Sequence, residues 1–302
     1  MRAWRFEKVE QGLFLADIPA PVPQAEQVVI NVKAAGLCHT DVGTIAGALI
    51  PPVLPMTLGH EIFGTIASMG SEVNGWRLGQ RVVVASNPTF GGDAEQVAVD
   101  SSRVVAVPDV VDDAVAASAA DAGITAYHAL HAQGGVSSGM EVGIIGLGGI
   151  GGPAAQMAVN VGANVYIAEI KQSLSTYADQ LGVAGFASTL ASFPDVAFDL
   201  ILDCAGDDTT SQAFSAIAPG GRIVQVGTNQ TKAKIDLLDV LWKEPQYLGS
   251  NTGTNEDLSN YLDLVAQGGV TPLIERIGFE DIPEGLDRLA RGSVSGRLVA
   301  VL

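Results

Sequence analysis

A cysteine, a histidine, a threonine and an aspartate occupy four consecutive positions, Cys38 to Asp41, in the stretch GLCHTDVG. A further histidine, His60, lies 22 residues after Cys38, in LGHEIFG. Thiolate and imidazole are natural zinc ligands, and a catalytic zinc is usually held by three protein ligands with one position left open. Ligands this far apart exclude a compact zinc finger and predict a site assembled from distant loops.

The residue types leave the third ligand open. The only other cysteine, Cys204, lies in the apolar stretch LILDCAG, so a carboxylate or another histidine is required. Asp121 stands out because it interrupts the small, apolar stretch AASAADAGITAY, where a buried carboxylate needs a partner. Without other information, a lone cysteine and a lone histidine are more often core and turn residues than ligands. The candidates for the third ligand are Asp121, Glu61, His128 and His131.

A glycine-rich turn, GLGGIG, follows the short apolar stretch EVGIIG. Gly146, Gly148 and Gly151 fit G-x-G-x-x-G, in which the glycines allow a tight turn, a close approach to a pyrophosphate and close helix packing. The N-terminus of the following helix offers N–H groups to the phosphates. Glu169 ends the next strand, 18 residues beyond Gly151, where an acid binds the ribose hydroxyls and repels a 2′-phosphate. This pattern favours NAD(H) over NADP(H), and the nearby Lys171 is the one residue that argues otherwise.

The elements that must position these residues are of two kinds. Stretches such as EQVVINVKAAG and GQRVVVASN predict strands, and HEIFGTIASMGSEVNGWRLGQRV predicts a hairpin. From about residue 120, strands alternate with helices, which predicts a doubly wound parallel sheet of the Rossmann type. The tail FEDIPEGLDRLARGSVSGRLVAVL predicts a helix, a glycine turn and a strand that return to the first domain. We therefore predict an α/β protein with a mostly β domain over 1–119 and 249–302 and a nucleotide-binding domain over 120–248.

Composition limits the class of protein further. The chain of 302 residues has 33 acidic and 16 basic residues, a net charge of −17, which disfavours a nucleic-acid partner. No apolar run reaches the roughly 18 residues of a membrane helix, and MRAWRFEKVE lacks the apolar core of a signal peptide. Two cysteines cannot form a disulfide framework. We expect a cytoplasmic protein that acts on a small molecule, without a membrane partner.

Together the motifs resemble those of the zinc-dependent alcohol dehydrogenases of the medium-chain dehydrogenase/reductase superfamily. The resemblance covers essentially the whole chain and rests on AAGLCHTD, LGHEIFGTIASMGSEVNGWRLGQRV, GGDAEQVAVD, GLGGIGGPAAQMAVNVGA and GSVSGRLVAVL. It implies that the mostly β domain is a GroES-like catalytic domain. It also implies an oxidoreductase that transfers a hydride between a primary or secondary alcohol, or the matching aldehyde or ketone, and NAD(H).

The resemblance also implies roles for single residues around one catalytic zinc. Cys38 and His60 match the first two ligands, and Asp121 stands where many members have a second cysteine, a change that zinc tolerates. Asp41 matches an acid that orients the zinc-bound imidazole, and Glu61 matches an acid close behind the metal that is an alternative ligand.

Further positions match the proton relay and the cofactor contacts. Thr40 matches the hydroxyl that begins the relay, whereas Gly43 occupies the place of a histidine that often ends it, so the proton needs another exit. Turn capping is the alternative role for Thr40 and Asp41. The positions that match cofactor contacts are His39, Thr125, Gly146, Gly148, Gly149, Ile150, Gly151, Glu169, Val226, Thr228 and Arg297.

A second departure from the family pattern concerns a lobe that holds a structural zinc in many relatives. Here only VVASNPTF separates GQRV from GGDAEQ, so we expect no structural zinc. By resemblance we expect a homodimer formed through the nucleotide-binding domain, with a tetramer as the alternative. Two other functions stay open: a zinc-free quinone or enone reductase of the same superfamily, and a non-catalytic NAD(H)-binding sensor.

Overall fold

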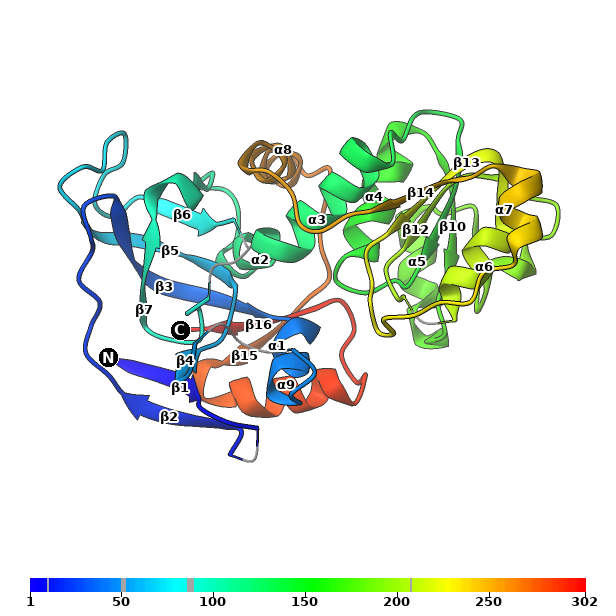
Figure 1. The fold of residues 1–302 in the computed structure, drawn as a ribbon. Coiled ribbons are helices and arrows are strands. Elements are labelled where there is room, and N and C mark those ends of the chain that lie inside the picture. The colour runs from blue at the N-terminus through cyan, green and yellow to red at the C-terminus, as the bar shows by residue number, and fades with distance from the viewer. Residues whose placement is uncertain (10, 50–52, 86–89, 207) are drawn as a thin grey trace. The chain divides into compact units, whose positions relative to one another are not determined.

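Residues 1–9, 11–49, 53–85, 90–206 and 208–302 are described by a computed structural model, in which the chain divides into two units (Figure 1). Unit 1 comprises Met1–Ala122, Thr254–Ala266 and Leu273–Leu302, and unit 2 comprises Gly123–Gly253 and Gln267–Pro272. The segment Gln267–Pro272, which the predicted boundaries assign to the catalytic domain, packs with unit 2. Its backbone is held there because the Gln156 amide bonds to both the N–H and the carbonyl of Thr271.

Unit 1 is mostly β. Its larger sheet has the order β15-β16-β3-β5-β6-β8, with β7 also paired to β3, and a smaller sheet has the order β2-β1-β4. The strands are β1 (Arg2–Phe6), β2 (Leu13–Asp17), β3 (Gln27–Leu37), β4 (Met56–Thr57), β5 (Glu61–Met69), β6 (Arg81–Val84), β7 (Gln96–Asp100), β8 (Val104–Ala106), β15 (Ile274–Gly278) and β16 (Arg297–Val301). The helices are α1 (His39–Ile45), α2 (Asp113–Ser118), α8 (Asn255–Ala266) and α9 (Ile282–Ala290).

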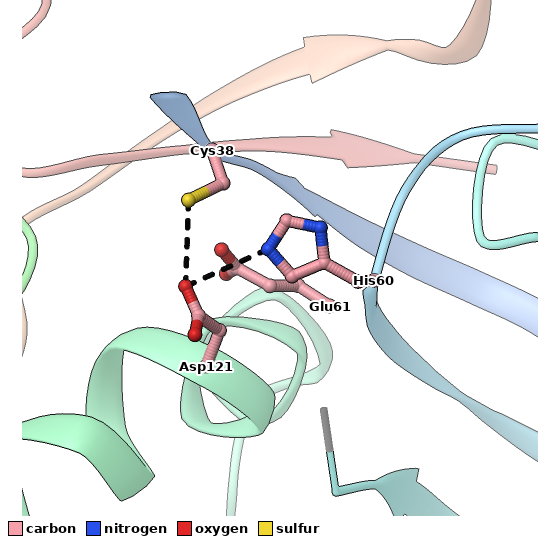
Figure 2. A group of neighbouring side chains, drawn as sticks. All are labelled: Cys38, His60, Glu61 and Asp121. Carbon is pink, nitrogen blue, oxygen red and sulfur yellow. Dashed lines mark hydrogen bonds and ion pairs between the residues drawn. The ribbon is translucent and has the colours of Figure 1, made fainter. Parts of the chain in front are cut away.

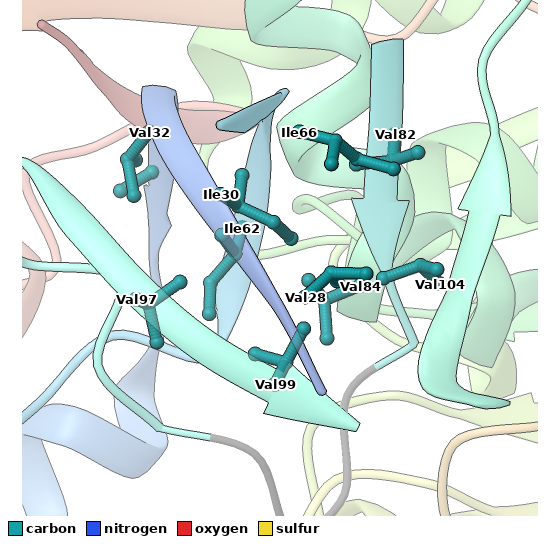
Figure 3. Close-up of a cluster of buried hydrophobic side chains, with 11 residues drawn as sticks. Val28, Ile30, Val32, Ile62, Ile66, Val82, Val84, Val97, Val99 and Val104 are labelled. Carbon is teal, nitrogen blue, oxygen red and sulfur yellow. The ribbon is translucent and has the colours of Figure 1, made fainter. Parts of the chain in front are cut away.

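One core cluster of unit 1 is built from side chains of the larger sheet (Figure 3). Alternate residues of a strand point to the same face, so Val28, Ile30 and Val32 of β3 project together. They pack with Ile62 and Ile66 of β5 and with valines of β6, β7 and β8, all buried. Each such side chain contributes about 1.5–3 kcal/mol by leaving water. This packing fixes the neighbouring ends of β3 and β5, where the candidate ligands stand.

Two predicted features of unit 1 are confirmed. β5 and β6 pair in antiparallel fashion, as the hairpin requires. The tail forms α9 and then β16, which pairs with β3 and brings Leu298 opposite Leu37. The C-terminal strand therefore lies beside the strand that leads to Cys38.

Unit 2 has a six-stranded parallel sheet in the order β11-β10-β9-β12-β13-β14. The order reverses between β9 and β12, and doubly wound sheets bind their ligands at such a switch point, beyond the carboxyl ends of the strands. The GroES-like and Rossmann-type fold class is confirmed. The strands are β9 (Glu141–Ile145), β10 (Asn164–Ala168), β11 (Gly185–Ala187), β12 (Phe198–Asp203), β13 (Ile217–Gln225) and β14 (Gln246–Gly249). The helices are α3 (Ile124–Tyr127), α4 (Gly151–Val161), α5 (Ser175–Leu181), α6 (Thr209–Ala216) and α7 (Leu237–Lys243).

The lengths of the helices show whether any of them could span a membrane. A membrane-spanning helix needs about 20 apolar residues. Across the described parts of the chain, no helix combines the length and the apolar character that a membrane span requires.

Candidate metal and dinucleotide sites

Four side chains of unit 1 converge on one point (Figure 2). Cys38 directly follows β3, and His60 directly precedes β5, whose first residue is Glu61. These strand ends are neighbours because Gly36 pairs with Glu61. Asp121 approaches from a short π-helical turn, Ala119–Gly123, a form of helix that is frequent at functional sites. One ligand atom from each of the four residues lies within 4.8 Å of the others.

The separations between the ligand atoms fit a tetrahedral zinc site. Cys38 Sγ lies 3.4 Å from Asp121 Oδ2, and His60 Nε2 lies 3.7 Å from the same oxygen. Zinc bonds of about 2.0 Å to N or O and 2.3 Å to S, at tetrahedral angles, place ligand atoms roughly 3.3–3.6 Å apart. Sulfur, nitrogen and oxygen donors suit zinc, so both the spacing and the chemistry of this set fit that ion.

Asp41 supports this cluster from behind. Its Oδ1 lies 3.3 Å from His60 Nδ1 and accepts a hydrogen bond from the Gly59 N–H, while Oδ2 accepts one from the Cys38 N–H. Turn capping and contact with the imidazole therefore coexist in one buried carboxylate. Burial disfavours the charged imidazole, but the Asp41 charge and the contacts with Asp121, Asp41 and Cys38 outweigh it and raise the pKa of His60 well above 6.5.

Arg297 lies among these acids. Its guanidinium contacts Glu61 Oε1 and donates to Asp121 Oδ2 at 2.8 Å, and its side chain is buried on β16. Glu61 is held close to the backbone of β3, because a Cβ at Gly36 would lie only 2.1 Å from Glu61 Oε2. The sequence suggested a pyrophosphate contact for Arg297, and its partners in unit 1 are the two carboxylates.

The residues beside Cys38 lie on α1. The Cys38 thiol donates to Thr40 Oγ1 at 3.6 Å, and both Thr40 and His39 are exposed. Gly43, in the place of a relay histidine, has Leu49 beside it: a Cβ there would lie 3.3 Å from Leu49 Cδ1. Thr40 is therefore next to the ligand cluster, and an apolar side chain covers the position where a relay residue would continue the path.

The glycine turn of unit 2 has the geometry that its pattern predicts. Gly146 has φ +91°, and a Cβ on Gly151 would lie 1.8 Å from the Gly146 carbonyl oxygen, so both positions require glycine. A Cβ on Gly148 would meet no atom within 4 Å, which leaves its backbone open to a ligand. Glu169 accepts hydrogen bonds from the N–H groups of Leu147 and Lys171, so the acid that directly follows β10 is tied to this turn.

The remaining predicted residues are all in unit 2. Thr125 is buried in α3, and Val226 and Thr228 follow β13, the first partly buried and the second exposed. Gly149 and Ile150 are partly buried just before α4. His128 and His131 belong to unit 2 and are not members of the ligand cluster. The shortened segment that replaces the structural-zinc lobe contains 86–89, which lie outside the described residues.

Sequence reasoning missed Asp93. It is fully buried, and neither carboxylate oxygen has a hydrogen-bond partner among the described residues. Burial and the nearby charge of Asp41 raise the pKa of Asp93 well above 3.8, and the charge of His60 lowers it. The sequence feature that could have pointed to Asp93 is an acid just before the strand pattern QVAVD, in GGDAEQVAVD.

Comparison with known proteins identifies the family of this chain. The family description "Alcohol dehydrogenase GroES-like domain" matches residues 24–109, and "Zinc-binding dehydrogenase" matches 149–267. An alcohol dehydrogenase from Geobacillus stearothermophilus is 27% identical, with 100% of this chain and 99% of the relative covered. The NADP-dependent alcohol dehydrogenase C of Mycobacterium bovis is 29% identical, with 92% and 91% covered. Acetophenone reductase from Geotrichum candidum, solved in complex with NAD, has a TM-score of 0.91 at 28% identity, with 100% and 97% covered.

Proposed function

Since the chain belongs to the medium-chain alcohol dehydrogenases, we propose that it is a zinc-dependent oxidoreductase that transfers a hydride between an alcohol and NAD(H). The substrate class is a primary or secondary alcohol, or the matching aldehyde or ketone. The observation that carries this proposal is the convergence of Cys38, His60 and Asp121, whose spacing fits zinc. The two family descriptions together cover more than half of the chain, which supports the same activity.

The residues of unit 1 would have three roles: binding the metal, orienting the histidine and balancing charge. Cys38, His60 and Asp121 would hold zinc, which supplies a Lewis acid that polarises the substrate oxygen and lowers the pKa of the alcohol. Asp41 orients His60 from its Nδ1 side. Arg297 offsets the negative charge that Glu61 and Asp121 bring to the cluster.

The proton of the alcohol requires a path to solvent. Thr40 is the acceptor that we assign to it, because its hydroxyl is within hydrogen-bond reach of the Cys38 thiol and is exposed. Gly43 has no side chain to continue the path, and the apolar Leu49 lies beside it. The proton therefore passes from Thr40 to water or to the exposed His39. A hydroxyl can serve this purpose because it both accepts and donates a proton.

NAD(H) is the cofactor we propose, bound over the turn from Gly146 to Gly151. Nicotinamide supplies the hydride acceptor, and the chain supplies alignment and electrostatics. The support for NAD(H) is Glu169, whose carboxylate next to the turn would repel a 2′-phosphate. The dissociation constants for NADH and NADPH, measured side by side, check this choice. We expect NADH to bind at least about 10-fold more tightly, a difference of about 1.4 kcal/mol in binding free energy. Tighter binding of NADPH would overturn it, and Lys171 would then be the first residue to replace.

The test of the function is alcohol-dependent reduction of NAD⁺ by purified protein, with and without a strong chelator. We expect turnover that chelation abolishes and added zinc restores. Full turnover in the absence of zinc would exclude the zinc mechanism. Reduction of an enone by NADH that is insensitive to chelation would favour the zinc-free reductase instead, and NADH binding without any turnover would favour a sensor.

We also propose that the chain is a cytoplasmic homodimer joined through unit 2. The support is α7, where four side chains are at least half exposed, and the adjacent β14, which is the edge strand of the sheet. An apolar helix beside an unpaired strand edge is a typical association surface. Cys38 and Cys204 are both free thiols, as expected in a reducing compartment. The exposed residues of α7 are Leu237, Leu238, Leu241 and Trp242.

A further inference from the structure

Asp93 is fixed against the segment that leads into His60. Its N–H donates to the Leu58 carbonyl at 3.1 Å, and its own carbonyl accepts from the Trp4 N–H at 2.8 Å. Gly59, the next residue, has φ +79°, and a Cβ there would lie 2.4 Å from Asp93 Oδ1. Only a glycine at this position allows the carboxyl to come so close to the backbone beside His60.

The Asp93 carboxyl and the His60 ring each have buried polar atoms without a hydrogen-bond partner, the first acceptors and the second a possible donor. Asp93 is fully buried, and both of its oxygens lack a partner among the described residues. His60 Nδ1 is also buried and makes no hydrogen bond of acceptable geometry. Buried polar groups in folded proteins are nearly always paired, so unpaired acceptors packed against Gly59, the residue before a histidine with an unpaired ring nitrogen, call for a functional explanation.

Asp41 does not fully satisfy the imidazole. Its Oδ1 lies 3.3 Å from His60 Nδ1 and is also the acceptor for the Gly59 N–H, at 3.4 Å. Both separations are longer than the usual 2.7–3.2 Å for an N–H···O hydrogen bond. One oxygen is thus shared weakly between two donors, which leaves room for a second carboxyl. The charge of Asp41 raises the pKa of Asp93 and that of His60 lowers it, which agrees with the packing of Asp93 against Gly59.

We propose that Asp93 is a second positioning residue for His60, acting with Asp41 on the Nδ1 side of the imidazole. The two acids hold the ring so that Nε2 faces Cys38 and Asp121. Acids of this kind, which bond to the far nitrogen of a metal-binding histidine, fix its tautomer and its orientation. The inference rests on the proposed zinc site. It adds a residue of this chain to the support of that site.

Three variants test the proposal. Asp93→Leu keeps a similar volume and removes the acceptor, and Asp93→Asn keeps one acceptor oxygen and removes the charge. Asp257→Asn is the matched control, because Asp257 is another buried acid of unit 1 whose carboxylate bonds locally to Thr254. The dissociation constant for zinc is measured by competition with a chromophoric chelator, and the absorption spectrum of the cobalt-substituted protein reports on the ligand geometry.

We expect Asp93→Leu to weaken zinc binding about 10–100-fold and to shift the cobalt bands. Asp93→Asn should recover most of that loss, and Asp257→Asn should change neither quantity. Wild-type zinc affinity with an unchanged cobalt spectrum in Asp93→Leu would overturn the proposal. If that variant does not fold, Asp93→Ala, which also removes the acceptor, takes its place with the same expected loss, and wild-type zinc affinity with an unchanged cobalt spectrum in Asp93→Ala would overturn the proposal. Wild-type protein that binds no zinc would instead refute the proposed function, and this inference with it.

Discussion

Glu169 and Asp203 in unit 2 and Glu61 and Asp93 in unit 1 are all buried acids, but their oxygens have different surroundings. Glu169 accepts two backbone N–H groups, and Asp203 accepts the N–H groups of Ala205 and Gly206 as well as threonine hydroxyls. In contrast, Glu61 Oε2 and both oxygens of Asp93 have no partner among the described residues.

The contrast separates acids whose oxygens accept hydrogen bonds from the protein itself from acids whose oxygens are left for another group. A carboxylate whose oxygens are filled by backbone N–H groups has a structural role and shapes the turn on which a cofactor rests. A buried carboxylate with free oxygens destabilises the fold unless another group compensates for it. Unit 1 concentrates such groups around Cys38, His60 and Asp121, which is the arrangement expected around a cation.

The largest effect should follow from removal of a ligand in unit 1. Asp121→Ala deletes the oxygen that lies nearest both Cys38 Sγ and His60 Nε2. We expect zinc binding to weaken by more than about 100-fold, beyond the range typical of residues that only support a ligand. Asp121→Cys is the control, because a second thiolate gives a ligand set that zinc also accepts. Metal analysis after dialysis checks both variants. Stoichiometric zinc in Asp121→Ala would make Glu61 the third ligand.

In unit 2 the corresponding test uses two glycines of one turn. Gly151→Ala places a methyl group 1.8 Å from the Gly146 carbonyl oxygen, so the turn must rearrange, and we expect a lower Tm together with loss of NADH binding. Gly148→Ala meets no protein atom within 4 Å, so the Tm should stay the same while NADH binding weakens. Thermal unfolding and NADH fluorescence titration separate the two outcomes. If the two variants showed the same changes in Tm and in NADH binding, there would be no basis for placing the pyrophosphate at Gly148.

The exposed face of α7 allows a test of assembly. Trp242 is 75% exposed, and a charge in its place should disfavour the proposed dimer. We expect Trp242→Glu to sediment as a monomer under conditions where the wild type sediments as a dimer. Ile170→Glu is the control, since Ile170 is an equally exposed apolar residue of unit 2 away from α7. Monomeric wild-type protein would contradict the proposed dimer.

The smallest effect concerns the two cysteines, one in each unit. Burial and the nearby charge of Asp203 raise the pKa of the Cys204 thiol to about 12. Because the thiolate is the reactive form, only about 1 in 10,000 Cys204 side chains is ionised at pH 8. In chelator-treated protein, a thiol reagent should therefore label Cys38 first, and Cys38→Ser should abolish the fast phase. Rapid labelling of Cys204 would contradict this assignment.

The two sites also differ in how far the sequence predicts them. The glycine turn and Glu169 are local, since a single unit of two strands and one helix, β9, α4 and β10, brings them together, and the pattern of residues is sufficient to predict it. The ligand cluster joins residues that are 83 positions apart, Cys38 and Asp121. Its convergence depends on the pairing of β3 with β5 and on the π-helical turn. The residue types indicated the candidate ligands, and only the family resemblance selected Asp121 among the candidates for the third ligand.

Arg297 and Asp93 show the limit of prediction from sequence. Arg297 is 176 positions from Asp121, and the two meet because β16 pairs with β3. Asp93 lies against Leu58 and Gly59, the two residues before His60, and no local pattern encodes these contacts. In both cases the partners come from tertiary packing, which spacing along the chain does not reveal.

X-ray absorption at the zinc edge of the loaded wild-type protein tests the central claim most directly. We expect one zinc per chain with one sulfur scatterer at about 2.3 Å and nitrogen or oxygen scatterers at about 2.0 Å, as the set Cys38, His60 and Asp121 requires. The Cys38→Ser variant should lose the sulfur contribution. A zinc shell without sulfur, or a chain that binds no zinc, would contradict the assignment of this cluster as the metal site.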